Sequence, residues 1–158
     1  MLFRSIEHRQ FKELPEILAA DDLIVFNNTK VIPARLLFKK STGALIEVFC
    51  LEPVGMSHQD AMSKAGEARW KCFVGGAKKW KEDQIIFIES NTASGEPFRI
   101  EAKRNASEDG AFELEFSWTP SALCFSEVLE LIGRIPLPPY IKRESTAFDV
   151  ERYQTDRK

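Results

Sequence analysis

The sequence predicts a mixed α/β fold that is rich in β-structure. Three runs alternate between apolar and polar residues with a period of two, which indicates antiparallel strands with one face in water. Other apolar runs are short and end at turn residues, so their length argues against helices. Helical spacing of apolar residues occurs near residues 12–18 and 126–132. Together these patterns favour a barrel or a sandwich with a few helices.

The first third of the chain is expected to contain a short helix and three strands. Residues 12–18 fit a helix, in which Pro15 is acceptable because it lies in the first turn. The continuously apolar run at residues 23–26 fits a strand buried on both faces. Strands are also expected at residues 34–38 and 45–52, with a Ser-Thr-Gly turn between them.

The middle of the chain predicts most of the antiparallel sheet. Residues 53–69 are polar, contain two glycines and are expected to form a long loop. Residues 85–88 form a short apolar strand, and three alternating strands place one face inward. The inward residues of these strands are Trp70, Cys72 and Val74, then Phe98, Ile100 and Ala102, then Phe112, Leu114, Phe116 and Trp118.

A helix is expected after these strands. Ser126 is a plausible N-cap, apolar residues follow at helical spacing, and Gly133 lies where a helix often ends. Pro136, Pro138 and Pro139 then require an extended segment.

Composition excludes several classes of protein. The 158 residues carry a net charge of −2, which does not indicate a nucleic-acid binder, although lysines and arginines cluster locally. No apolar run has the length of a membrane helix and no signal peptide is visible, so we expect a soluble, cytoplasmic protein. Cys50, Cys72 and Cys124 are odd in number and far apart, which argues against both a disulfide framework and a zinc site. No metal site is expected.

Three polar segments are candidates for a small-molecule site. The expected substrate-binding residues are Asn27, Asn28, Thr29, Lys30 and Arg35, then Tyr140 and Arg143, then Tyr153, Gln154 and Thr155. Amides can read base edges or sugar hydroxyls, cations can hold a phosphate or carboxylate, and Tyr140 can contact a base. Each segment also has an alternative interpretation. The asparagines of the first can hydrogen-bond to the backbone of a turn, and the second can be a rigid proline linker or a proline-rich ligand for another domain. The third can be an exposed helix end.

A fourth segment, residues 74–81, combines glycines, lysines and a tryptophan. It fits neither a P-loop nor a dinucleotide-binding motif. Lys78, Lys79 and Lys81 are candidates for gripping a nucleic-acid backbone, with Trp80 stacking on a base. The alternative is a turn between strands, with solvated lysines and Trp80 packed on the barrel.

Four blocks, in this order, resemble the S-adenosylmethionine:tRNA ribosyltransferase-isomerases of queuosine synthesis. DLIVFNNTKVIPARL resembles the family's D-L-L-V-F-N-D/N-T-R/K-V-I-P-A-R-L block, and WKCFVGGAKKWKEDQ resembles its strand followed by G-x-x-K-K-x-K. LELIGRIPLPPYIKR and ERYQT resemble its I-G-x-x-P-L-P-P-Y-I-x-R and E-R/T-Y-Q-T blocks. The resemblance extends from about Ile6 to Thr155, and GALIEVFCLEPV looks most like the Bacteroidetes branch.

The resemblance implies a tRNA-modifying reaction. S-adenosylmethionine is the co-substrate, and its ribosyl group is transferred to 7-aminomethyl-7-deazaguanine at the tRNA wobble position and rearranged. The sulfonium acidifies the ribose C5′ hydrogens, so a base starts the loss of adenine. The aminomethyl nitrogen then attacks the sugar, and methionine leaves as the epoxide of epoxyqueuosine-tRNA forms. No metal or redox cofactor is implied, and the sequence does not identify the base.

The resemblance also implies an inserted antiparallel β-barrel at residues 53–125. Residues 1–52 and 126–158 would be portions of the larger α/β substrate-binding domain. Family members continue past Y-Q-T to an A-P-T-A-G-L-H-F-T block with a proton-transfer histidine, which this sequence lacks. We therefore expect an incomplete larger domain, little activity from the chain alone, and self-association through exposed apolar surface. The alternatives are a non-catalytic tRNA-binding β-barrel module and a structural fragment with neither activity.

Overall fold

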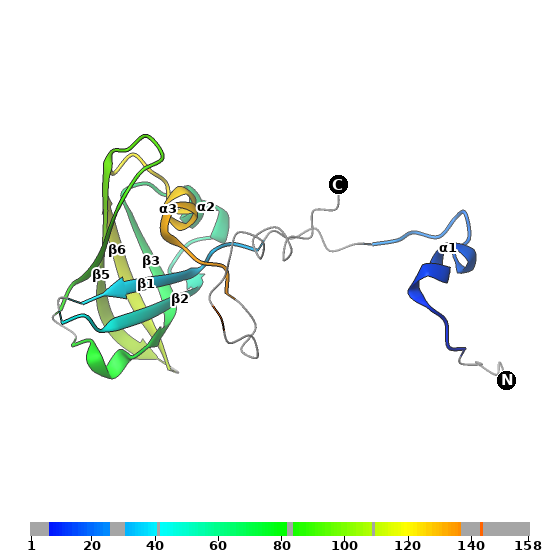
Figure 1. The fold of residues 1–158 in the computed structure, drawn as a ribbon, viewed down its shortest axis with the longest axis horizontal. Helices are drawn as coiled ribbons and strands as arrows, with labels where there is room; N and C mark the ends of the chain where they lie inside the picture. Colours follow the sequence, from blue (N-terminus) through cyan, green and yellow to red (C-terminus); the bar gives the residue numbers. More distant parts are fainter. Residues whose placement is uncertain are drawn as a thin grey trace. The chain divides into compact units, whose positions relative to one another are not determined.

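The structure is a computed structural model that describes residues 7–25, 31–40, 42–81, 84–108, 110–136 and residue 143. The chain divides into two compact units. One contains residues 1–29 and 155–158, and the other contains residues 30–154. Figure 1 shows both.

The larger unit is a barrel of antiparallel strands. The strands are β1 (Arg35–Lys39), β2 (Leu45–Pro53), β3 (Glu67–Gly75), β4 (Ile86–Asn91), β5 (Pro97–Glu108) and β6 (Ala111–Thr119). Their order in the sheet is β1-β2-β3-β6-β5-β4. Because β1 and β4, the two ends of this order, pack against each other, the sheet curls into a nearly closed barrel (Figure 1). The predicted β-rich fold is confirmed.

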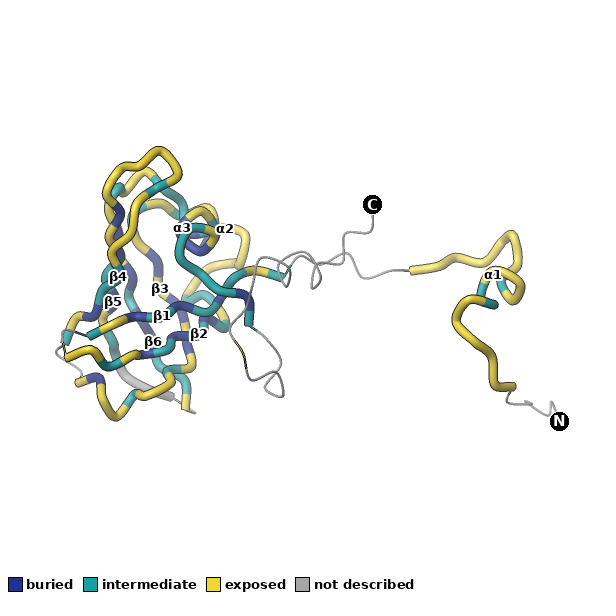
Figure 2. The backbone as a smooth tube through the Cα atoms, viewed as in Figure 1, coloured by how far each residue is buried: buried dark blue, intermediate teal, exposed yellow. Residues whose placement is uncertain are grey.

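Alternation along the strands builds the core. The dark blue segments of Figure 2 alternate with paler ones along β3, β5 and β6, as the period of two predicts. The inward residues of these strands are Ala68, Trp70 and Cys72, then Phe98, Ile100 and Ala102, then Leu114, Phe116 and Trp118. The predicted inward face of these strands is therefore confirmed, with Val74 and Phe112 only half-buried at its edge.

Two helices pack at one end of the barrel. α3 (Phe125–Ile132) inserts Phe125, whose ring lies 5.2 Å from Trp70 and 5.8 Å from Phe116 and Trp118 between centroids. Its N-cap is Cys124 rather than the predicted Ser126, and Glu127 Oε2 accepts a 2.8 Å hydrogen bond from the Cys124 N–H. α2 (His58–Ser63) lies beside it, capped by Ser57 (Figure 1).

The structure corrects one expectation about connections. The segment predicted as a long loop, residues 53–69, contains α2 and the first residues of β3. The sheet also includes β1 and β2, so its strands begin before the predicted barrel boundary at residue 53. The assignment of the remaining residues to a larger domain stays a prediction.

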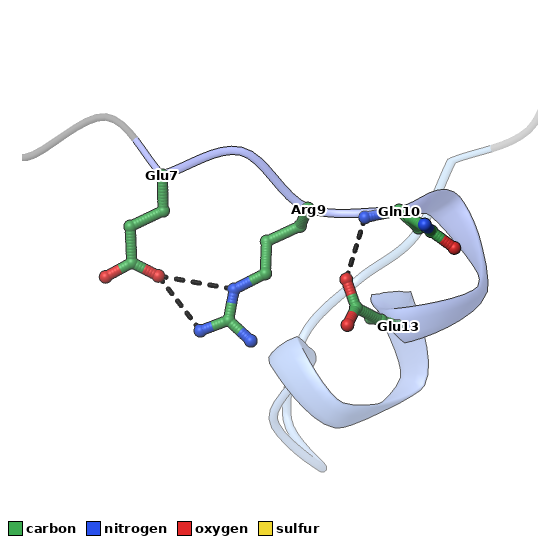
Figure 3. A network of polar contacts seen from close by, with 4 residues as sticks. All are labelled: Glu7, Arg9, Gln10 and Glu13. Atoms are coloured by element: carbon green, nitrogen blue, oxygen red, sulfur yellow. Dashed lines mark hydrogen bonds and ion pairs between the residues drawn. The ribbon is translucent and has the colours of Figure 1, made fainter.

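In the smaller unit, the described residues 7–25 make local contacts and none of them is buried. It contains η1 (Phe11–Glu13) and α1 (Leu14–Ile17), in agreement with the expected short helix, and Pro15 lies in its first turn. Figure 3 shows its polar contacts: Glu13 Oε2 accepts from the Gln10 N–H at 2.7 Å, and Arg9 pairs with Glu7. Such exposed pairs contribute little to stability.

The expected strand at residues 23–26 is wrong for the part that the structure describes. Leu23 is 90% exposed and Val25 is 84% exposed, and residues 22–25 are not in a strand. A strand buried on both faces needs neighbours in a sheet. No described strand pairs with these residues.

Candidate functional site

The first candidate segment meets the end of α3 beside the barrel at what we call the junction, residues 33–35 and 133–134. The Arg134 N–H donates to the Arg35 carbonyl at 2.8 Å, and the Arg35 N–H donates to the Arg134 carbonyl at 3.2 Å. The backbone approach at Gly133 is so close that a Cβ there would collide with the Pro33 carbonyl oxygen. Residues about a hundred positions apart in sequence are thus held together by backbone contacts.

Arg35 is the predicted substrate-binding residue that lies at the junction. Its Nε donates to Glu47 Oε1 at 2.5 Å, and the two side chains are 26% and 43% exposed. The buried neighbours Ala34 and Leu36 point inward, so alternation along β1 directs Arg35 to the outer face. A guanidinium that is held by a carboxylate and is partly exposed to solvent is suited to binding an anion.

Most of the other predicted substrate-binding residues lie outside the described part of the chain. These are Asn27, Asn28, Thr29, Lys30, Tyr140, Tyr153, Gln154 and Thr155. Arg143 is described and exposed. Whether these residues gather around the junction therefore stays a prediction.

The basic segment forms a turn at the end of the barrel away from α3. It contains η2 (Ala77–Lys79), which begins after Gly76 in the left-handed conformation with φ of 75°. Lys78, Lys79 and Lys81 are exposed.

Trp80 does not have the role that was predicted for it. It is 1% exposed, and its indole N–H donates to the Gln84 carbonyl at 2.6 Å. A base cannot stack on a ring that is buried on both faces, so in this structure Trp80 anchors the turn. This is the alternative that the sequence left open, in which Trp80 packs on the barrel.

A mixed-charge hollow lies on the outer face of β3, β6 and β5. Its volume is about 360 Å³, and none of the predicted site residues lines it. Its charged lining residues are Lys64, Glu67, Arg69, Glu101, Lys103 and Glu115. The lysine at position 64 forms a 2.8 Å ion pair with Glu67 and lowers the pKa of that carboxyl. Such a balanced surface gives no preference for an anionic or a cationic ligand.

The described residues offer little for metal or thiol chemistry. No group of three His, Cys, Asp or Glu side chains in this part of the chain is placed to hold a metal ion. All three cysteines are free thiols. Cys50 and Cys72 lie opposite each other in β2 and β3 with sulfurs 3.9 Å apart, and burial, together with Cys50, raises the pKa of Cys72 well above its ordinary value.

Among the described residues, no helix combines the length and the apolar character that a transmembrane span requires.

Sequence reasoning missed three residues that shape these sites. Glu47 alternates outward on a predicted strand, but a pairing with Arg35 depends on strand register. Lys40, whose ammonium donates to the Lys79 carbonyl, is one of several locally clustered lysines, and its contact with Lys79 depends on the fold. Gly133 was assigned to a helix end, whereas its close contact with Pro33 is visible only in three dimensions.

The four blocks point to one family of proteins, and the comparisons with known proteins agree. Residues 2–156 match the queuosine biosynthesis protein family, and the chain belongs to that family. The recognition made from the four blocks is confirmed.

Several curated relatives carry the name S-adenosylmethionine:tRNA ribosyltransferase-isomerase. The protein from Anaeromyxobacter sp. (strain Fw109-5) is 39% identical over 96% of this chain and 39% of its own length. Those from Thermotoga maritima and Anaeromyxobacter dehalogenans are 37% and 36% identical, over 96% and 94% of this chain and 38% of their own lengths. The chain thus spans about two fifths of the length of these relatives. No solved structure matches it.

Proposed function

We propose that this chain contributes the barrel and part of the substrate-binding region of a tRNA ribosyltransferase-isomerase in queuosine biosynthesis. S-adenosylmethionine is the ribosyl donor, and 7-aminomethyl-7-deazaguanine at the wobble position of a cytoplasmic tRNA is the acceptor. The product is epoxyqueuosine-tRNA, with adenine and methionine released. The names of relatives that match more than nine tenths of this chain support the reaction.

The observation that carries the proposal is the junction. The first and third family blocks are joined there by two backbone hydrogen bonds. Residues 27–30 directly precede the junction in sequence, and Tyr140 and Arg143 follow it. The junction of the two blocks on the larger unit favours binding of S-adenosylmethionine and the modified base beside it.

Arg35 has the clearest role in this proposal. It binds the carboxylate of S-adenosylmethionine or a phosphate of tRNA, while Glu47 fixes the direction of the guanidinium. Asn27, Asn28, Thr29 and Lys30 contact the ribose or base. Tyr140, Arg143, Tyr153, Gln154 and Thr155 complete the substrate contacts. The catalytic base is not assigned, and no metal or redox cofactor is part of the proposal.

A chimera tests the proposal. This chain replaces the matching part of the Thermotoga maritima relative, and the product is measured by nucleoside mass spectrometry after incubation with S-adenosylmethionine and tRNA carrying the aminomethyl base. We expect epoxyqueuosine to form. Arg35→Ala should lower kcat/KM roughly 10- to 150-fold, since a hydrogen bond to a charged group contributes about 1.5–3 kcal/mol. Arg99→Ala, which removes an arginine paired with Glu89 and Glu101, is the matched control and should have little effect.

Two results would count against the proposal. A chimera that melts cooperatively and binds tRNA, yet forms no epoxyqueuosine, would favour the second candidate, a non-catalytic tRNA-binding barrel. Unchanged turnover and S-adenosylmethionine affinity in Arg35→Ala would remove that residue from the site.

We also propose that isolated copies of the chain associate with one another. Phe11, Leu23 and Val25 are between 77% and 90% exposed, which is unusual for large apolar side chains grouped in one segment. Sedimentation should show a concentration-dependent dimer that is lost in Leu23→Ser/Val25→Ser. A monomer at all concentrations would contradict this.

A further inference from the structure

The end of the barrel away from α3 carries a group of lysines from two separate parts of the sequence. We call this group the basic end; it consists of Lys39, Lys40, Lys78, Lys79 and Lys81. Lys39 and Lys40 close β1 at the hairpin to β2, and the others belong to the β3–β4 connection. The Lys40 ammonium donates to the Lys79 carbonyl, so the two parts are in direct contact.

The turn that carries Lys78, Lys79 and Lys81 is held from three sides. Arg104 Nη1 donates to the Ala77 carbonyl at 3.2 Å, Lys40 donates to the Lys79 carbonyl, and Trp80 donates to the Gln84 carbonyl. Within the turn, the Lys79 N–H donates to the Gly76 carbonyl at 2.8 Å. A loop fixed in this way loses little conformational entropy when it binds a ligand.

The charge of the basic end is not balanced locally by the residues that the structure describes. No ion pair joins any of its five lysines to a described carboxylate. Glu82 and Asp83 follow in sequence but lie outside the described residues. By contrast, Lys64, Lys71 and Arg99 elsewhere on the barrel each pair with a glutamate. The chain as a whole has a net charge of −2, but the local positive field at this end attracts a polyanionic partner.

We infer that the basic end binds the phosphate backbone of the RNA substrate. Lysine ammonium groups act as point charges toward phosphates, which gives affinity and orientation without reading the sequence. The buried ring of Trp80 supports this reading over base stacking, because no aromatic face is offered between the lysines. The inference rests on the proposed function in naming tRNA as the polyanion.

The test is a binding titration of the 158-residue chain with a fluorescently labelled, unmodified tRNA transcript at several salt concentrations. The variant is Lys78→Gln/Lys79→Gln/Lys81→Gln. Each lost phosphate contact reduces the slope of log K against log salt by about 0.7–0.9, which at ~0.1 M salt corresponds to roughly a fivefold to eightfold loss of affinity. The triple variant should therefore bind roughly 125- to 500-fold more weakly, with a slope shallower by about 2–3.

The matched control is Lys64→Gln/Lys71→Gln/Arg99→Gln, which removes the same charge from residues already paired with glutamates. We expect it to weaken binding less than twofold. Thermal melting of each variant verifies that it is folded. The inference is overturned if the two triple variants lose affinity equally or if the basic-end variant binds like the parent.

This measurement is independent of the chemistry, because S-adenosylmethionine is absent and no product is formed. Lysine-dependent tRNA binding without turnover in the chimera would overturn the proposed function alone. Turnover with tRNA binding that is insensitive to these lysines would overturn the present inference alone.

Discussion

Replacing Gly133 by alanine tests whether the junction exists as the structure has it. Gly133 has φ of −75°, which any residue adopts, so in open space the change would stabilise the fold by about 0.4–1 kcal/mol through the unfolded chain. At the junction, the new Cβ instead collides with the Pro33 and Leu129 carbonyl oxygens. Because both are backbone atoms, the segments must separate, and overpacking of this kind costs about 1–3 kcal/mol. The change in the free energy of unfolding therefore has opposite signs in the two cases.

Urea denaturation followed by tryptophan fluorescence measures this change in the free energy of unfolding, since Trp70, Trp80 and Trp118 are all buried. Hydrogen exchange adds a local measurement, because the Arg35 and Arg134 amides donate across the junction and should lose protection. Gly95→Ala is the control: no atom lies near its new Cβ, but its φ of 85° costs about 1–2 kcal/mol without affecting those amides. A Gly133→Ala protein as stable as the parent, with unchanged protection, would refute the reasoning.

Three further predictions concern the barrel. Phe125→Ala should lower the free energy of unfolding by about 3–5 kcal/mol in urea titrations, because the ring is fully buried among three aromatic side chains. The hydrogen bond from the Cys124 N–H lowers the pKa of Glu127 in the fold, so its stabilisation is present above the ordinary carboxyl pKa and is lost as pH falls through the lowered value. Glu127→Gln should remove that part of the acid sensitivity of Tm, and an unchanged pH profile would argue against the cap. With a thiol reagent at pH 8, Cys124 should react first, whereas buried Cys50 and Cys72 should react only on unfolding; equal rates for all three would contradict the packing of β2 on β3.

The strands could be predicted because each carries its own signal. Trp70, Cys72, Leu114 and Phe116 alternate with charged residues, and burial on one face of a sheet requires that period. α2 carries no comparable signal, because Ala61 is its one fully buried residue, Met62 is only partly buried, and the other four residues of HQDAMS are polar. The apolar run at residues 23–25 carries a strong local signal for a strand, but the structure has no strand there. Its composition fits a buried strand, but pairing depends on neighbours that no local pattern reveals.

The sites were harder to predict because their geometry depends on register and contact between distant residues. Arg35 meets Glu47 diagonally across β1 and β2, and Lys40 meets Lys79, which lies in the connection between β3 and β4. Tryptophan is a residue type that can stack on a base. The ring of Trp80 is instead buried in the core, and its N–H donates to a backbone carbonyl. Residue type indicated the chemistry available in each segment, but only the fold decides which side chains remain exposed to use it.

In the proposed enzyme, the length of β1 separates Arg35, which binds substrate at the junction, from the basic end, which positions the tRNA. Arg35 and Lys39 lie at its two ends, four residues apart, which at about 3.3 Å per residue is roughly 13 Å. A nucleoside at the junction therefore cannot touch the basic end, but phosphates about four nucleotides along a duplex strand are spaced to reach it, at ~3.4 Å per nucleotide. In the chimera, neutralising Lys78, Lys79 and Lys81 should thus raise KM for tRNA and leave kcat unchanged, whereas Arg35→Ala should reduce kcat/KM whatever the salt concentration. If the lysine variant lowers kcat at saturating tRNA, the basic end acts in the chemical step and the separation along β1 is wrong.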